Sequence, residues 1–489
     1  MTRSAKLLLV AFLWGWRAVA ADLTAQLDAI IDGPAFAQAQ WGVKVCALDS
    51  GATIYARNAD KLLKPASNGK IYTAALALDR LGPDFRIKTS VYAAAPPDAQ
   101  GVIQGDVTVY GRGDPSFSAR FNGGDYTKAL QPLLDAFAKA GIKRIEGDLI
   151  GDETYFSGPP YGADWTWDDL ENYYGAPTSA LTLQDNVIDL QFEPAADVGA
   201  PCRIITHPET SFIAFSNFTQ TIASGEAHFR LFCPLGENVA YVWGQAPLHG
   251  AAHTDAIPVQ QPALWFVTML KEGLAQRGIV VAGNVRVKTW LDRASGSAAP
   301  PHVEVASVEG RPISEIVKQT LKPSENLYAQ LLLLQVGAKN PLINNGDTAE
   351  AGLHALRFFL TGAGIGSGLV ALSDGSGLSR GSLVTPSASV QLLTRMAHHS
   401  AKDAFVNALP IGGVDGTLRN RFKGTAAAGN VRAKTGSLQY VDTLSGYLTN
   451  KAGGKLVFSI MLNNYREPSG GPSGRAAIDS LVRLLVDSQ

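Results

Sequence analysis

Charged side chains are scarce in this chain of 489 residues, because Asp, Glu, Lys and Arg together make up 17%, against about 25% in ordinary soluble domains. Neither sign predominates, since 42 basic residues stand against 43 acidic ones. The chain therefore lacks the basic excess that nucleic-acid binding requires. With 46% hydrophobic residues, it is not an intrinsically disordered chain either. The length permits about three domains with sizeable cores.

Long apolar stretches are also missing, with one exception at the start of the chain. Arg3 and Lys6 precede an apolar run from Leu7 to Trp16, and Ala18-Val19-Ala20 follows. This pattern is typical of a secretory leader with an A-x-A cleavage site, so residues 1–20 are expected to be a signal peptide. The run is too short to span a bilayer, and no later segment offers about 18 uninterrupted apolar residues. We expect a soluble, periplasmic protein without a stable membrane anchor.

The chain contains only three cysteines. Three cysteines exclude a disulfide-framework protein and a four-cysteine zinc site. Export places the protein where disulfides persist, and Cys202 and Cys233 lie in one strand-like region, so they are the favoured pair for a bridge. Cys46 is expected to be a small core residue. His249 and His253 lack the H-E-x-x-H context of a zinc site, so we expect no metal and no cofactor.

Hydrophobic patterning divides the chain into three parts. Strands at 42–46 and 52–55 and a helix at 71–81 come first. A β-rich texture then extends from about Phe85 to Trp290, and an Ala/Ser/Gly/Pro-rich linker follows at 293–301. Helical patterns return at 313–321, 327–336 and 385–397, before a strand at 431–435, a hairpin at 443–462 and a helix from Gly474.

A serine and a lysine lie three residues apart in Ser67-Asn68-Gly69-Lys70, at the start of the first predicted helix. Residues at this spacing share one helix face, so the lysine amine is placed to act as the base for the serine hydroxyl if burial keeps it neutral. The motif alone is weak, because a helix cap followed by a solvated lysine matches it equally well. The chain has no Gly-x-Ser-x-Gly elbow, which excludes an α/β-hydrolase.

Two later motifs strengthen this interpretation. Ser324-Glu325-Asn326 lies in a break between two predicted helices, and Lys434-Thr435-Gly436 lies on a predicted strand. The glycine leaves room for a ligand to lie against that strand. Ser-x-x-Lys, Ser-x-Asn and Lys-Thr-Gly in this order form the signature of β-lactamases and penicillin-binding proteins.

The sequence resembles the serine D-alanyl-D-alanine carboxypeptidases/endopeptidases of the class C low-molecular-mass penicillin-binding proteins, peptidase family S13. The resemblance covers nearly the whole mature chain, and Ser67 and Ser324 are separated by more than half of its length, far more than in single-domain β-lactamases. The matching segments are Pro65-Ala66-Ser67, Ser324–Ala329, Asp374–Arg380, Lys434–Leu438 and Ser445-Gly446-Tyr447.

The resemblance implies an α/β fold: a transpeptidase-like, serine β-lactamase-like domain that a large β-rich insertion divides. The expected catalytic domain comprises residues 21–86 and 302–489. The expected insertion, residues 87–301, forms one or two further domains, with a nested one at about 112–196.

The resemblance also implies the site and its ligands, which are peptidoglycan stem peptides and β-lactam antibiotics. Ser67 would be the nucleophile, Lys70 its base and Ser324 a proton relay. The expected substrate-binding residues are Asn326, Lys434, Thr435, Gly436 and Ser437, with Lys434 and Thr435 holding the terminal carboxylate and the Ser67 and Ser437 N–H groups holding the oxyanion.

Two motifs of the insertion have competing interpretations. Asp168, in an aromatic segment with Trp165 and Tyr173, either reads the free amine of a diaminopimelate side chain, as similar residues do in the family, or belongs to a turn that packs the insert. Arg112-Gly113-Asp114 matches an adhesion tripeptide, but the family has a similar turn without that role.

Two rival functions remain open from the sequence. A serine β-lactamase would share the three motifs, although no Glu-x-x-Leu-Asn stretch resembles the class A deacylation loop. A catalytically inert cell-wall-binding protein is the other, and the presence of both lysines and both hydroxyls argues against it.

Overall fold

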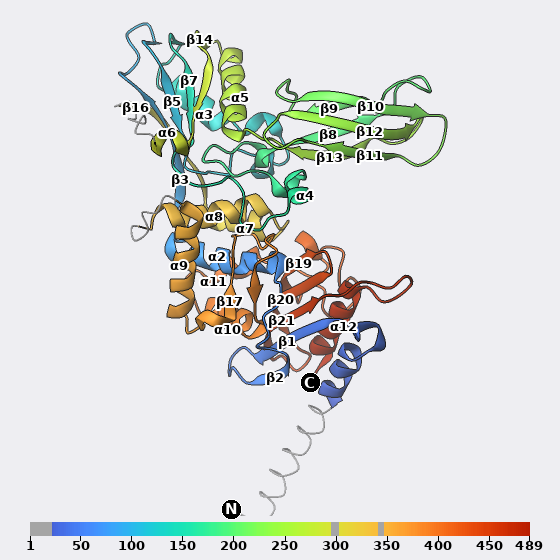
Figure 1. The fold of residues 1–489 in the computed structure, drawn as a ribbon. Helices are drawn as coiled ribbons and strands as arrows, with labels where there is room; N and C mark the ends of the chain where they lie inside the picture. The colour runs from blue at the N-terminus through green and yellow to red at the C-terminus, as the bar shows by residue number, and fades with distance from the viewer. Residues whose placement is uncertain (1–21, 295–302, 341–346) are drawn as a thin grey trace, which may run out of the picture. The chain divides into compact units, whose positions relative to one another are not determined.

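The computed structural model describes residues 22–294, 303–340 and 347–489 (Figure 1). The predicted leader, residues 1–20, and most of the predicted linker lie outside the described residues. The chain divides into two compact units. The first comprises the chain up to Pro83 with Val317–Ala329 and Leu353–Gln489, and the second comprises Asp84–Ile316 and Gln330–Gly352. The domain limits expected from the sequence stay predictions.

The first unit contains a five-stranded antiparallel sheet in the order β19-β20-β21-β1-β2. β1 pairs with β21 over its whole length, from Gln40 opposite Asn463 to Ala47 opposite Leu456. A strand near the start of the chain is thus hydrogen-bonded to one near its end. The strands are β1 (Gln40–Ala47), β2 (Thr53–Arg57), β19 (Arg432–Leu438), β20 (Val441–Thr449) and β21 (Lys455–Asn463).

Helices cover both faces of this sheet. On one face, Phe458 of β21 packs in a core with Leu27, from a helix at residues 22–31, and Leu481 of α12 (Gly474–Asp487). On the other face, the Tyr447 hydroxyl donates to the Leu393 carbonyl of α10 (Pro386–Ala397) at 2.7 Å. Both faces of β21 are therefore buried, which explains why seven consecutive apolar or small residues follow Lys455.

The other helices of the first unit include α2, which carries the Ser-x-x-Lys lysine. Every residue of α2 from Gly69 to Leu78 is buried, so apolar residues occur all around it and not on one stripe. The chain passes between the two units within α7, α8 and α9. These helices are α2 (Gly69–Arg80), α7 (Ile313–Leu321), α8 (Asn326–Ala338), α9 (Thr348–Gly362) and α11 (Lys402–Ala408).

The second unit contains a mixed five-stranded sheet in the order β15-β7-β5-β3-β16, whose parallel strands β15, β7 and β5 lie side by side. A small parallel sheet, β14-β6-β4, belongs to the same unit. The strands are β3 (Arg86–Ala93), β4 (Val102–Ile103), β5 (Val107–Tyr110), β6 (Arg144–Ile145), β7 (Leu149–Asp152), β14 (Val280–Val281), β15 (Val285–Lys288) and β16 (Val303–Pro312).

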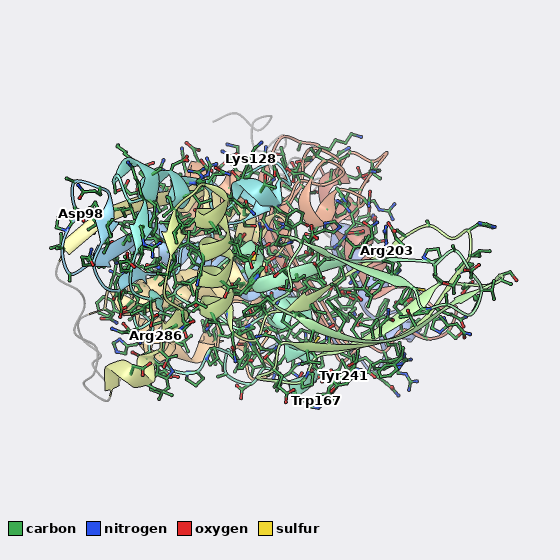
Figure 2. All side chains as sticks on the ribbon, turned by 90° about the horizontal axis from the view of Figure 1, so that it is seen from above. Asp98, Lys128, Trp167, Arg203, Tyr241 and Arg286 are labelled. Carbon is green, nitrogen blue, oxygen red and sulfur yellow. The ribbon has the colours of Figure 1, made fainter. Side chains whose placement is uncertain are left out.

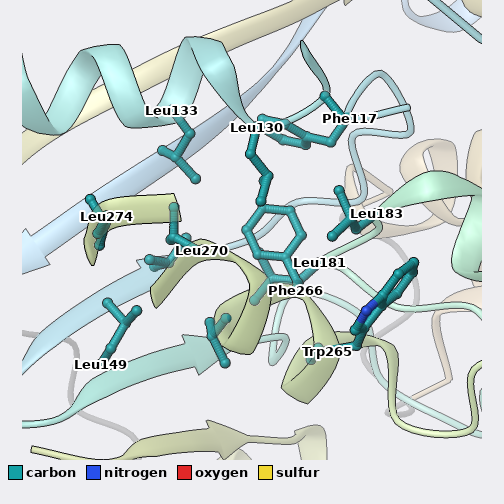
Figure 3. Close-up of a cluster of buried hydrophobic side chains, with 14 of the residues drawn as sticks. Phe117, Leu130, Leu133, Leu149, Leu181, Leu183, Trp265, Phe266, Leu270 and Leu274 are labelled. Atoms are coloured by element: carbon teal, nitrogen blue, oxygen red, sulfur yellow. The ribbon is translucent and has the colours of Figure 1, made fainter. Parts of the chain in front are cut away.

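The core of the second unit lies between these strands and the helices α3 (Gln131–Lys139) and α5 (Pro262–Gln276) (Figure 3). Leu133 of α3 and Phe266 of α5 are fully buried there. The Phe117 and Phe266 rings meet edge to face, with centroids 5.3 Å apart. Figure 1 also shows the short helices α4 (Trp167–Leu170) and α6 (Trp290–Ala294).

Six further strands of the second unit, between Val187 and Pro258, form two three-stranded sheets. The Phe192 and Phe229 rings, one from each sheet, stack with centroids 4.5 Å apart, so the sheets share a core. The first sheet has the order β13-β8-β9 and the second β10-β12-β11. Their strands are β8 (Val187–Glu193), β9 (Arg203–His207), β10 (Ala214–Ile222), β11 (His228–Phe232), β12 (Val239–Pro247) and β13 (His253–Pro258).

The predicted Cys202–Cys233 disulfide is wrong, because both cysteines are free and buried. The Cys202 backbone N–H donates to Thr219 on β10, whereas Cys233 directly follows β11. Because β12 lies between β10 and β11, these strands are about 10 Å apart, farther than the span that a disulfide can bridge. Cys46, the predicted core residue, is buried in β1.

The Arg-Gly-Asp tripeptide is a structural element of the second unit. Asp114 is 2% exposed and accepts hydrogen bonds from the Ser116 backbone N–H and hydroxyl. The Arg112 guanidinium lies 4.7 Å from the centroid of the Tyr110 ring and donates to the Lys88 carbonyl. A buried aspartate is not accessible to an adhesion receptor, so the structural interpretation holds.

None of the helices in the described part of the chain has the length and apolarity that a membrane crossing requires.

Candidate active site

Ser67 lies in a single 3-10 turn, Ala66–Asn68, that leads directly into α2 at Gly69. Ala66 has φ of +48°, a left-handed conformation that costs energy for any residue other than glycine and is typical of functional turns. The strained turn places Ser67 just before the helix and Lys70 within its first turn. The predicted helix at 71–81 therefore starts two residues earlier than expected.

The Lys70 amine contacts three oxygens in the first unit. It lies 2.8 Å from the Ser67 Oγ, 2.5 Å from the Asn326 Oδ1 and 2.9 Å from the Ser376 carbonyl. The amide and the carbonyl oxygens can only accept hydrogen bonds, whereas the hydroxyl can also donate one. A neutral Lys70 would therefore direct its two N–H bonds at Asn326 and Ser376 and its lone pair at the Ser67 hydroxyl.

A second lysine and a second serine form an analogous pair. The Lys434 amine donates to the Ser324 Oγ at 2.8 Å and to the Thr435 carbonyl at 2.8 Å. Lys434 is on β19, and Ser324 occupies a left-handed conformation with φ of +71° in the break between α7 and α8. The structure thus brings together three of the predicted residues, Ser67, Lys70 and Asn326, and pairs two others, Lys434 and Ser324.

Both lysines are fully buried, at 0% exposure. Burial lowers the pKa of Lys70 to about 8, although the carboxylates of Asp374 and Glu325 oppose this effect. Burial also holds the pKa of Lys434 well below its usual range, and the nearby Lys70 lowers it further. Desolvation penalises the charged amines, so this environment brings the pKa of Lys70 close to physiological pH and raises the fraction of the neutral form that a base requires.

Strand β19 lies directly against the serine turn. A Cβ at Gly436 would meet the Thr443 Oγ1 at 2.3 Å and the Pro65 carbonyl oxygen at 2.7 Å. The Asn68 Nδ2 donates to the Lys434 carbonyl at 3.1 Å and to the Thr443 Oγ1 at 2.6 Å. Glycine is therefore required at 436 by a close approach of backbone to backbone.

The segment Asp374–Ser379 supplies the Ser376 carbonyl to Lys70. The Asp374 carboxylate, 1% exposed, accepts hydrogen bonds from the backbone N–H groups of Ser376, Gly377 and Leu378. A Cβ at Gly377, where φ is +77°, would lie 1.9 Å from the Ala66 carbonyl oxygen. These contacts hold the loop against the serine turn.

The loop that carries Ser324 is held from its other side. The Lys322 amine binds both oxygens of Asp415, at 2.6 and 2.8 Å, and the Leu409 carbonyl at 2.6 Å. Gly416 packs so closely that a Cβ there would lie 2.6 Å from the Lys322 carbonyl oxygen. An ion pair and a backbone contact therefore fix the second motif.

The two hydroxyls on either side of Gly436, those of Thr435 and Ser437, have polar partners of their own. The Thr435 Oγ1 donates to the Thr417 Oγ1 at 2.7 Å. The Ser437 Oγ donates to the Asp442 carboxylate at 2.7 Å and accepts from Arg475 at 3.2 Å. Both hydroxyls lie on the same strand as Lys434, and the Arg475 guanidinium is beside Ser437, which suits recognition of a carboxylate.

Asp168 lies outside this network, in α4 of the second unit. It is exposed, and its carbonyl accepts a hydrogen bond from Asn172 at 2.7 Å. The neighbouring Asp169, not Asp168, makes the capping box with Thr166. The predicted contact of Asp168 with a substrate amine stays a prediction.

Sequence reasoning missed three residues of the site. Asn68 lies inside the Ser-x-x-Lys motif, and Ser376 lies in a segment that supports the family resemblance. The sequence therefore drew attention to both positions but did not indicate what either residue does. Ser376 acts through its backbone carbonyl, which no side-chain pattern reveals. Thr443 was unmarked, because its importance depends on its contact with Pro65 and Asn68.

These features define a fold of the penicillin-recognising α/β type with added sheets. The structural similarity extends to the crystal structure of penicillin-binding protein 4 (DacB) from Haemophilus influenzae, with a TM-score of 0.78, 26% sequence identity and coverage of 95% of this chain and 97% of that one. A peptidoglycan endopeptidase of Bdellovibrio bacteriovorus shares the fold, with a TM-score of 0.52 over 92% of each chain at 17% identity.

The family follows from the sequence comparison. The model of the D-Ala-D-Ala carboxypeptidase 3 (S13) family matches residues 23–485. A D-alanyl-D-alanine carboxypeptidase of Actinomadura sp. (strain R39) is 34% identical over 483 residues, which cover 95% of this chain and 85% of the relative. The H. influenzae carboxypeptidase DacB is 28% identical over 412 residues, 83% of this chain and 82% of the relative. The chain belongs to the S13 family of D-Ala-D-Ala carboxypeptidases.

Proposed function

We propose that this protein is a periplasmic serine D-alanyl-D-alanine carboxypeptidase that also acts as a DD-endopeptidase on peptidoglycan stem peptides, through an acyl-enzyme on Ser67. The observation that carries the proposal is the 2.8 Å hydrogen bond between the Lys70 amine and the Ser67 hydroxyl, made by a buried lysine whose other two partners can only accept. A nucleophile requires such a neutral base within hydrogen-bond reach.

In the proposed acylation step, the Ser67 Oγ attacks the carbonyl carbon of the penultimate D-alanine and its proton passes to the Lys70 amine. The backbone N–H groups of Ser67 and Ser437 stabilise the negative charge on the carbonyl oxygen. The peptide C–N bond then breaks, and the proton taken up by Lys70 passes to the departing amine through the Ser324 hydroxyl, which gives one proton and receives one. Water hydrolyses the resulting ester, which regenerates the Ser67 hydroxyl.

In the proposed mechanism the two lysines have different protonation states once substrate is bound. The terminal carboxylate of the substrate, held by Thr435, would favour the charged form of Lys434, because an opposite charge offsets the desolvation of the amine. A charged Lys434 would in turn favour the neutral, basic form of Lys70. Substrate binding would therefore set the protonation states that the acylation step needs.

The same chemistry extends to two further ligands. If the departing amine belongs to a neighbouring stem peptide, the step cuts a crosslink, which is endopeptidase activity. A β-lactam would acylate Ser67 and leave slowly. Support comes from the Haemophilus penicillin-binding protein 4, for which a complex with a β-lactam is known, and from the Bdellovibrio relative, a peptidoglycan endopeptidase.

The test measures penicillin labelling and D-alanine release on the same preparation. Intact-protein mass spectrometry after penicillin treatment should show one adduct, which Ser67→Ala abolishes and the control Ser480→Ala, on the exposed side of α12, retains. A stem pentapeptide should lose its terminal D-alanine, and a crosslinked muropeptide should be cleaved. An adduct on the Ser67→Ala variant would refute the nucleophile.

The same preparation distinguishes the two rival functions. A β-lactamase would turn over penicillin many times and release no D-alanine. An inert wall-binding protein would retain muropeptides and yield no product. Fractionation of cells that express the full chain, with the amino terminus of the mature protein sequenced, tests the periplasmic location and the removal of residues 1–20.

A further inference from the structure

The outer face of the sheet β10-β12-β11 carries four large aromatic side chains that the core does not use. Their exposed fractions are 67% for Phe218, 42% for Trp243, 40% for Phe232 and 37% for Tyr241. Strand register places Phe218 opposite Trp243, and Tyr241 opposite Phe232. Figure 1 shows the three strands side by side, and Tyr241 is labelled in Figure 2. We call these four residues the aromatic face.

The four residues of the aromatic face do not contribute to the core of the sheet. The alternate residues of β12, Ala240 and Val242, point inward and are fully buried, so the sheet already has an apolar side. The Tyr241 and Phe232 rings lie at centroids 6.1 Å apart with a tilt of 32°, which makes a nearly continuous platform. Exposed aromatic surface of this extent usually marks an interaction site.

Polar side chains that donate or accept hydrogen bonds border the four rings. Residues paired across β10, β12 and β11 form rows that run perpendicular to the strands. The first row consists of Ser216, Tyr241 and Phe232, and the second of Phe218, Trp243 and Arg230. A third row consists of Gln220, Gln245 and His228. These three rows contain no Asp, Glu, Leu, Ile or Met, so the face consists of aromatic rings and polar side chains without acidic groups.

We propose that the aromatic face binds the glycan strand of peptidoglycan. The carbon-bound hydrogens of pyranose rings pack on the faces of aromatic rings, and the hydroxyl and acetamido groups at the sugar edges hydrogen-bond to amide, hydroxyl and guanidinium groups. The face spans about 10 Å across its three strands, enough for a short oligosaccharide. This inference rests on the proposed function, in which the substrate peptide is attached to such a strand.

Charge favours the same ligand. Arg230 is the one residue of the three rows that is charged at all physiological pH values, and none of the nine residues is acidic. Peptidoglycan carries the carboxylates of its stem peptides along the glycan, so a face with a cation and no anion complements it. The face would thus hold the polymer while individual stem peptides are hydrolysed.

The test uses glycan strands released from purified peptidoglycan by an amidase that removes the stem peptides. Isothermal titration of the full mature protein should detect binding, and the Phe218→Ala/Trp243→Ala double variant should weaken it about tenfold or more, because stacking area is lost. Trp243→Phe should retain most of the affinity. Phe358→Ala is the matched control, because Phe358 is a comparably exposed aromatic residue, at 66%, on α9.

Release of D-alanine from a soluble stem pentapeptide should be equal in the double variant, the control and the wild type, whereas release from intact sacculi should fall in the double variant alone. The inference would be overturned if the double variant bound glycan strands as tightly as the wild type, or if the wild type did not bind them. Concentration-dependent dimerisation that the double variant abolishes, without strand binding, would assign the face to a second copy. If the wild type binds glycan strands but does not hydrolyse the pentapeptide, the proposed function is wrong and the inference about the aromatic face stands.

Discussion

Lys70 illustrates how the environment of one residue determines its chemistry. In water its amine would be charged and unable to accept a proton. Full burial lowers its pKa to about 8, and the carboxylates of Asp374 and Glu325 keep the pKa from falling further. The Asn326 and Ser376 oxygens then orient the amine. The pKa of the lysine therefore lies near neutral pH, and its amine lies within hydrogen-bond distance of the Ser67 hydroxyl.

This arrangement predicts the pH dependence of acylation. Because the reactive form of Lys70 is the neutral one, the second-order rate of penicillin acylation should rise about tenfold per pH unit below the pKa and level off above about 8. Stopped-flow measurements across this range test the sign. A rate that falls as pH rises through the same range would contradict the role of Lys70 as base.

Glu325→Gln is the companion variant. The Glu325 carboxylate raises the pKa of Lys70, so its neutralisation should move the midpoint of the acylation profile to lower pH and increase the rate under acidic conditions. A midpoint that moves upward, or does not move, would show that Glu325 does not act on Lys70.

Gly436 is a second residue whose surroundings determine its identity, because there is no room for a side chain. A methyl group there would lie 2.3 Å from the Thr443 Oγ1 and 2.7 Å from the Pro65 carbonyl oxygen. Gly436→Ala should destabilise the protein by about 1–3 kcal/mol and slow penicillin acylation about a hundredfold, because β19 and the serine turn are pushed apart. Gly362→Ala is the control, since a Cβ at Gly362 meets no neighbouring atom. Equal acylation rates for the two variants would refute the steric argument.

At the scale of elements, the site depends on the contact between the Ser67 turn and strand β19. Thr443 on the neighbouring strand β20 also binds the turn, through one hydroxyl that accepts from the Asn68 Nδ2 at 2.6 Å and donates to the Pro65 carbonyl at 2.9 Å. The Asn68 amide also reaches the Lys434 carbonyl. Three elements are thus joined by two buried polar side chains.

Thr443→Val removes this hydroxyl and keeps the side-chain shape. It leaves a buried donor and a buried acceptor without that partner, so we expect a loss of about 1–3 kcal/mol of stability together with slower acylation of Ser67. Chemical denaturation and penicillin labelling measure the two effects. Thr361→Val provides the comparison, because Thr361 is exposed and its hydroxyl bonds only within α9. If both valine variants behave alike, the Thr443 hydroxyl does not hold the turn.

At the scale of the whole molecule, the pairing of β1 with β21 closes a unit whose parts are distant in the sequence. The register runs without a break across eight residue pairs. Because β19 and β20 continue the same sheet, the position of Lys434 depends on strands from both ends of the chain. Loss of this sheet should therefore abolish the site, whatever the state of the second unit.

Phe458→Ala tests this dependence. Phe458 is fully buried in β21, so its truncation should cost about 3–5 kcal/mol and lower the temperature at which penicillin labelling of Ser67 disappears. Phe358→Ala, on an exposed aromatic residue, should leave that temperature within about a degree or two. Labelling that survives to the same temperature in both variants would show that the site does not need the sheet.

Much of the catalytic unit was predictable because its signals are local. The helix at 313–321 has the bounds expected from its apolar spacing, and the helix expected at 385–397 begins one residue later, at Pro386. The predicted hairpin at 443–462 is β20 paired with β21. The disulfide was not predictable, because two cysteines in one strand-like region say nothing about the strand that lies between them.

The sequence by itself determined the family, the order of the elements and the candidate catalytic side chains, because motif spacing and hydrophobic periodicity depend only on neighbours along the chain. Tertiary structure alone decided that Ser376 faces Lys70 with its carbonyl, that Thr443 joins the serine turn to β20, and that four aromatic residues of β10, β11 and β12 share one exposed face. Those relations depend on strand register and on burial, which arise only when distant segments pack together.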